Sequence, residues 1–121
     1  SWEIIKDNPL FGVGTGDFPQ EYKKINMAKT PNMNNANNPH NMYILILTQL
    51  GLIGLISFLS IFYFQFKASY HSKDILSKNV GFAMPIMFLV IMFSDSYLLG
   101  HFTTLIFIFF SSFLYKDFDT A

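Results

Sequence analysis

The sequence predicts an all-α membrane protein in which three transmembrane helices follow the end of a periplasmic loop. Only 13% of the 121 residues are charged, which is about half the usual share in a soluble domain. The aromatic content of 18% also argues against a disordered chain. A net charge of zero leaves no basic surface for nucleic acid, and the absence of cysteine excludes disulfides and thiolate metal sites.

Residues 42–66 are the most apolar segment, with 25 residues and no charge. As a helix they would measure roughly 37 Å, enough to cross a hydrocarbon core of about 30 Å. The segment is apolar on all sides, which argues against a surface amphipathic helix, so we expect a transmembrane helix. Gly51, Gly54 and Ser57 recur every three residues, either by chance or as a face that lets another helix approach closely.

The sequence after this helix predicts a polar loop, a transmembrane helical hairpin and a tail, at residues 67–79, 80–115 and 116–121. The hairpin segment is too long for one crossing. A break at Gly100-His101 divides it into spans at about 80–99 and 102–115. Pro85 would then lie in the first turns of its helix, where proline costs least.

The lysines predict the orientation. Lys67, Lys73 and Lys78 make the 67–79 loop cytoplasmic by the positive-inside rule, and Lys116 falls on the same side after two more crossings. Residues 1–41 would then face the periplasm, although they carry four lysines of their own.

Residues 1–41 are polar and rich in Asn, Pro and Gly, which is typical of a loop. Residues 1–7 predict one or two helical turns. They resemble the middle of a protein sequence rather than its start, so we expect the chain to be the C-terminal part of a longer protein.

Gly12, Gly14 and Gly16 alternate within this loop. They lack the third-glycine spacing and the flanking elements of a dinucleotide-binding loop. A structural turn is the favoured interpretation, and a phosphate site built from free backbone N–H groups is the alternative.

Pro39-His40-Asn41 stands directly before the long apolar segment. Asn41 can cap the helix, with His40 as a bystander at the membrane surface. Alternatively, His40 can take a proton from a hydroxyl or stabilise developing charge.

Asp95, in Ser94-Asp95-Ser96, and His101 interrupt the second apolar segment. An acid within such a segment is a functional candidate by default. Near the turn of the hairpin, however, we favour solvation or pairing of Asp95 and His101 at the membrane surface. No spacing typical of metal ligands is present.

Together, two stretches resemble motifs of the O-antigen ligase and polymerase family. The first runs Asn8-Pro9-Leu10-Phe11-Gly12-Val13-Gly14-Thr15-Gly16-Asp17-Phe18. The second joins Pro39-His40-Asn41-Met42-Tyr43-Ile44-Leu45 to Gln49-Leu50-Gly51-Leu52-Ile53-Gly54-Leu55. Residues 94–101 and the apolar span after them are similar to the family's C-terminal helix pair.

The resemblance implies a multi-pass glycosyltransferase of the bacterial inner membrane, with residues 1–41 as the end of its large periplasmic loop. It implies a glycan donor on undecaprenyl pyrophosphate and, for a ligase, transfer to the lipid A core in lipopolysaccharide biosynthesis. His40 matches the family's catalytic histidine and would activate the acceptor hydroxyl, with no metal or other cofactor. The motifs also offer candidates for substrate binding: Asn41, Tyr43, Gly12, Gly14 and Gly16.

Several alternatives share these motifs. An O-antigen polymerase joins repeat units, and some relatives glycosylate proteins, so the acceptor stays open. A non-enzymatic transport or assembly segment is the alternative of another class. Family members hold the pyrophosphate with arginines, and this chain has none. We expect those arginines upstream of Ser1, and we expect the 121 residues alone to be inactive.

Overall fold

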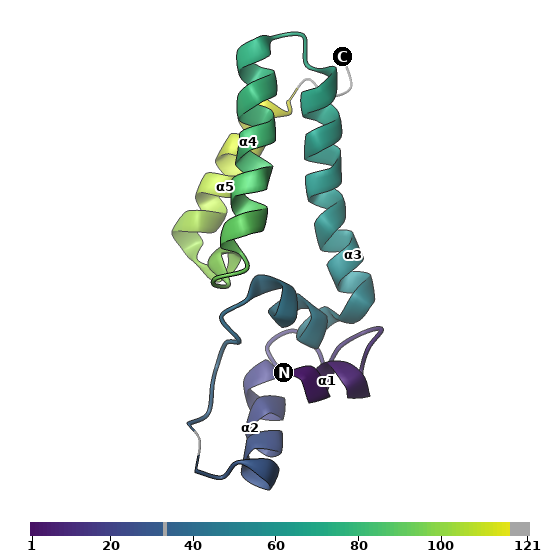
Figure 1. Cartoon of the computed structure of the whole chain (residues 1–121), viewed down its shortest axis with the longest axis vertical. Coiled ribbons are helices and arrows are strands. Elements are labelled where there is room, and N and C mark those ends of the chain that lie inside the picture. Colours follow the sequence, from purple (N-terminus) through teal and green to yellow (C-terminus); the bar gives the residue numbers. More distant parts are fainter. Residues whose placement is uncertain (33, 117–121) are drawn as a thin grey trace.

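The computed structural model describes residues 1–32 and 34–116, and in these two ranges it contains helices and no strand. The elements are α1 (Trp2–Asp7), α2 (Phe18–Lys29), α3 (Met42–His71), α4 (Ile75–Ile91), the 3-10 helix η1 (Tyr97–Leu99) and α5 (His101–Leu114) (Figure 1). This confirms the all-α class and the short helix expected in residues 1–7.

The longest helices, α3, α4 and α5, run along the long axis of the molecule, and α4 contacts both of the others. Helices α1 and α2 lie beyond one end of this group, where they contact α3 (Figure 1). An ion pair between Glu3 and Lys29 joins α1 to the end of α2. The chain therefore consists of three long helices with two short helices, α1 and α2, at one end.

α3 is broken at Gly51, whose backbone is not helical (φ 66°, ψ −164°). The break leaves a continuous helix from Leu52 to His71. Within the described residues, α3 is the helix long and apolar enough to cross a membrane. The sequence predicted a helix here correctly. The residue that approaches Gly51 closely is Leu10 of the preceding loop rather than a residue of another helix.

Three transmembrane spans were predicted, and of the described helices α3 alone is long and apolar enough to be one. α4 has 17 residues and α5 has 14, or about 25 Å and 21 Å, so neither matches a full hydrocarbon core. The 67–79 loop was also predicted too long, since α3 continues to His71 and α4 begins at Ile75. The charged residues predicted the position of that loop, whereas hydrogen bonds at the helix ends determine where the helices end and begin. Asp74 caps α4 by accepting a hydrogen bond from the amide of Ser77, 2.8 Å away.

The hairpin turns earlier than predicted, because α4 ends at Ile91 and α5 begins at His101. Because α4 begins at Ile75, Pro85 lies inside this helix rather than in its first turns. A proline deprives the carbonyl four residues earlier of its donor. That carbonyl belongs to Gly81, and it accepts a hydrogen bond at 2.7 Å from the hydroxyl of Tyr115, the residue directly after α5. The tail predicted at 116–121 lies outside the described residues except for Lys116.

Aromatic contacts connect the long helices. The Phe107 ring of α5 lies 5.6 Å from Phe62 of α3 and 4.9 Å from Phe88 of α4. Phe62 and Phe88 are buried, yet α5 itself contributes no buried residue. Exposed apolar surface on this scale is typical of helices that lie in a membrane or against further protein. Together with the length of α3, it indicates a membrane protein.

Candidate functional site

The site is built where the segment before α3 meets the segment after α4. The backbone amide of Met42 donates a hydrogen bond to the carbonyl of Met92 at 3.0 Å. The side chain of Asn41 donates to the carbonyl of Phe93 at 3.1 Å. These bonds hold residues 38–41 against residues 92–96, so two motifs far apart in the sequence lie side by side.

His40 pairs with Asp95 in this place. The imidazole Nδ1 lies 3.2 Å from Oδ1 of Asp95. An ionised carboxylate only accepts hydrogen bonds, so opposite an ionised Asp95 the hydrogen lies on Nδ1, and Nε2 is the ring nitrogen left for a substrate. The side chains of His40 and Asp95 are 75% and 44% exposed, so a substrate can reach the pair.

The backbone of His40 is constrained, since its φ of 51° lies in the left-handed region that side chains rarely adopt. Asn38 holds this conformation. Its Oδ1 accepts hydrogen bonds from the His40 amide at 3.0 Å and from the buried Ser96 hydroxyl at 2.8 Å. The Ser96 amide in turn donates to Asp95 Oδ1 at 2.7 Å. Asn38 and Ser96 therefore fix both members of the His40–Asp95 pair.

Asn41 and Tyr43, expected to bind substrate, direct their polar atoms to the protein itself. Asn41 caps α3, as its Oδ1 accepts a hydrogen bond from the Ile44 amide at 3.1 Å. The Tyr43 hydroxyl donates to the carbonyl of Leu89 at 2.6 Å, and its ring lies 4.5 Å from that of Phe93. Both residues thus join α3 to the end of α4, beside the pair.

The alternating glycines form a structural turn against the break in α3. The amides of Val13 and Gly14 donate to the carbonyls of Thr48 and Gln49, each at 2.9 Å. These amides are therefore not free to hold a phosphate, which favours the structural interpretation of the motif. Gly12 and Gly14 both have positive φ, as the turn requires.

Gly16 also has a positive φ, and it precedes Asp17, the residue at the start of α2. The glycine turn and His40 lie at different points of α3. Thr48 is six residues after Met42, or about 9 Å along the helix. The turn therefore supports the half-helix that follows His40 and does not bring its glycines to the His40–Asp95 pair.

The sequence singled out His40 and Asp95 separately and did not pair them. It favoured either solvation of Asp95 and His101 or their pairing at the membrane surface. Asp95 is 44% exposed, and its partner is His40. Asn38 and Ser96 were not recognised as positioning residues. Asn-Pro is a known turn-initiating dipeptide, so the sequence held a signal for Asn38 but none for its bond to Ser96.

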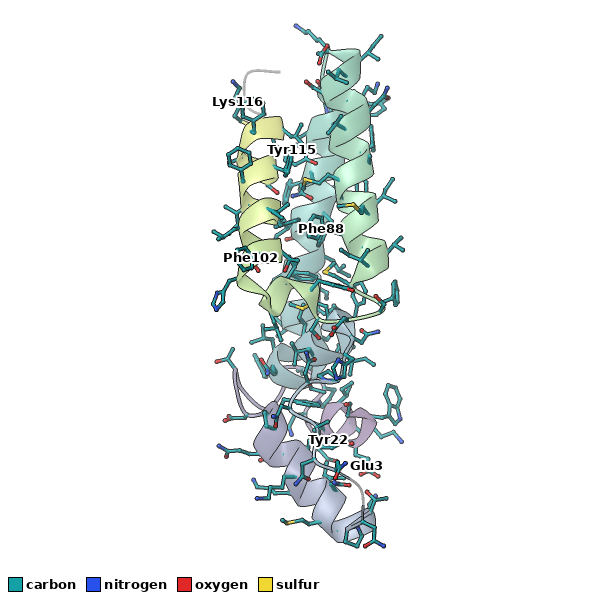
Figure 2. All side chains as sticks on the ribbon, turned by 90° about the vertical axis from the view of Figure 1, so that its left-hand side faces the viewer. Glu3, Tyr22, Phe88, Phe102, Tyr115 and Lys116 are labelled. Atoms are coloured by element: carbon teal, nitrogen blue, oxygen red, sulfur yellow. The ribbon has the colours of Figure 1, made fainter. Side chains whose placement is uncertain are left out.

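The end of the long helices that carries Lys73 and Lys116 lies opposite this site. The connection between α3 and α4, which contains Lys73, is at the far end of the long helices from α1 and α2 (Figure 1). Figure 2 places Lys116 at that same end and Glu3 and Tyr22 at the other. The orientation, with residues 67–79 cytoplasmic and residues 1–41 periplasmic, stays a prediction.

Comparison with known families gives one match. Residues 1–59 match the family model described as O-antigen ligase. The matched segment includes the glycine turn, His40, Asn41 and the break in α3, whereas Asp95 lies beyond it. Searches of curated proteins and of solved structures returned no match.

Proposed function

We propose that this chain, whose residues 1–59 match the O-antigen ligase family, acts in a membrane glycosyltransferase that ligates O-antigen glycan to the lipid A core. The observation that supports this most is the His40–Asp95 pair. It presents an exposed imidazole whose orientation is fixed by a carboxylate, which is what a general base requires.

In the proposed reaction, Nε2 of His40 accepts the proton of the acceptor sugar hydroxyl. The hydroxyl oxygen forms a bond with the anomeric carbon of the donor glycan as the bond from that carbon to the pyrophosphate oxygen breaks. Undecaprenyl pyrophosphate leaves with the bonding electrons. Asp95 stabilises the imidazolium that forms, through the hydrogen bond at Nδ1.

Arginine forks match the oxygens of a leaving pyrophosphate, and this chain contains lysines but no arginine. We propose that a further part of the enzyme supplies the arginines, on the periplasmic side of the inner membrane. The 121 residues would then bind and activate the acceptor without completing the reaction alone.

The test replaces His40 by alanine in the full-length gene, expressed in a cell that lacks its own copy, with lipopolysaccharide resolved on a gel. His101→Ala is the matched control, because His101 is an exposed histidine near the same turn and outside the pair. Membrane levels of each variant are measured alongside. General-base catalysis contributes roughly 10² to 10⁴-fold, so H40A is expected to abolish the long-chain ladder while H101A keeps it.

The products that accumulate identify the reaction. Long lipid-linked glycan without a ladder indicates a ligase. Core carrying a single repeat unit indicates an O-antigen polymerase, and an intact ladder with loss of glycoprotein indicates a protein O-oligosaccharyltransferase. An unchanged ladder and unchanged glycoproteins would reject the catalytic role of His40 and favour a non-enzymatic transport or assembly segment.

A further inference from the structure

Residues 8–14 form a turn that fills the break in α3, and this turn exposes two large apolar side chains. Leu10 is 53% exposed and Phe11 is 74% exposed. We propose that this turn lies within the membrane, at the end opposite Lys67, and that Leu10 and Phe11 contact lipid acyl chains. The proposal depends on α3 as a membrane span and is independent of glycosyl transfer.

The depth of the turn follows from its bonds to α3. The amide of Leu52 donates to the carbonyl of Pro9 at 2.9 Å, and the amide of Ile53 donates to that of Leu10 at 3.3 Å. The turn is therefore level with Leu52. From Leu52 the first charged residue along α3 is Lys67, about 22 Å away along the helix.

A hydrocarbon core is about 30 Å thick. With Lys67 at one boundary, Leu52 and the turn bonded to it remain several ångströms inside the other. Any tilt of α3 places them deeper still. The first 41 residues were predicted to be a periplasmic loop, and this part of them would instead enter the bilayer.

The backbone groups that the break in α3 leaves unpaired find the partners that such a position requires. In hydrocarbon every backbone donor and acceptor needs a partner, so irregular segments there are tolerated only where protein satisfies them. The break at Gly51 disrupts the bonds that the Leu52 and Ile53 amides would make to the Thr48 and Gln49 carbonyls. The turn supplies all four partners, two carbonyls for the amides and two amides for the carbonyls.

The surface around the turn favours lipid as its occupant. Leu50, Leu52 and Ile53 are 41%, 45% and 48% exposed, so the apolar surface of α3 extends to the turn without interruption. Polar residues flank the apolar tip on both sides, with Asp7-Asn8 before it and Thr15 after it. This arrangement is that of a short apolar tip inserted from a polar surface.

Spin labelling tests the proposal, because the chain has no native cysteine. Leu10→Cys and Phe11→Cys are labelled with a nitroxide in the full chain reconstituted into phosphatidylcholine vesicles. Power saturation then compares collisions with oxygen, which concentrates in the bilayer, and with a water-soluble nickel chelate. Ile56→Cys on α3 is the lipid reference and Met27→Cys on α2 the water reference, since both parent side chains are 61% exposed.

Labels at 10 and 11 are expected to prefer oxygen over nickel to the same degree as the label at 56. A preference for nickel like that of the label at 27 would overturn the proposal. Low accessibility to both reagents would also overturn it, because the tip would then be covered by protein. Helicity measured by circular dichroism must match the unsubstituted chain, and two tip positions guard against a local effect of either label.

Discussion

Replacing Gly51 by alanine is expected to detach the 8–14 turn from α3. At φ 66° and ψ −164°, an L-residue pays about 1 to 3 kcal/mol in backbone strain. The new Cβ would also lie 2.3 Å from the backbone carbon and oxygen of Leu10, which cannot rotate away. Such overpacking adds about 1 to 3 kcal/mol. The total, about 2 to 6 kcal/mol, is a large part of the ~5 to 15 kcal/mol that stabilises a typical protein.

Gly16→Ala is the matched control. Gly16 also has a positive φ, 88°, but no atom lies within 4 Å of the position its Cβ would take. It therefore carries the backbone strain of about 1 to 3 kcal/mol without the overpacking. The assay is denaturant unfolding in detergent micelles, followed by circular dichroism. Hydrogen exchange at the amides of Val13 and Gly14 is measured in parallel, because these amides bond to α3.

G51A should lose more stability than G16A, and only G51A should lose protection at the two amides. Equal losses in the two variants would refute the reasoning, since the contact with Leu10 would then cost nothing. Full protection of the Val13 and Gly14 amides in G51A would refute it as well, because the turn would have kept its place.

Three further outcomes are expected. Asp95→Asn should lower glycan transfer by His40 roughly 10² to 10⁴-fold with unchanged membrane levels, since the imidazolium loses its counter-charge; normal transfer would contradict this. Asn41→Ala should lower the free energy of unfolding by about 1 kcal/mol through loss of the α3 cap, measured by denaturant titration. Hydrogen bonds from Ser77 lower the pKa of Asp74 from its ordinary 3.8. The cap should therefore stabilise α4 above that value and be lost as the pH falls through the lowered pKa. Thermal unfolding of Asp74→Ala should thus differ from the unsubstituted chain at neutral pH and converge with it in strong acid.

Local patterns predicted the elements more reliably than their ends. The uncharged run of 42–66 predicted α3, and Asn41 was correctly identified as its cap. The helix continues to His71, beyond the charge-based end of the predicted span at residue 66, because lysine and serine are tolerated on an exposed helix surface. The position of Pro85 was wrong for the same reason, since α4 starts five residues before the predicted span.

The candidate site was predictable only in part. The motif containing His40 pointed to a histidine before a membrane helix, and an acid in the second apolar segment pointed to Asp95. Their pairing depends on how α4 returns along α3, and on an end of α4 that the sequence placed too late. Pairing across 55 positions leaves no local pattern in the sequence, because each of the two side chains could equally well be solvated by water.

By itself, the sequence determined the apolar composition, the helical class and the residue types available for chemistry, because these depend on local periodicity and side-chain character. Only the tertiary structure decided that the glycine motif fills a break in α3 and that Asn38 and Ser96 hold His40 against Asp95. The physical reason is that a helix break frees backbone groups that must find partners. Those partners come from whichever distant segment the packing brings within hydrogen-bond distance.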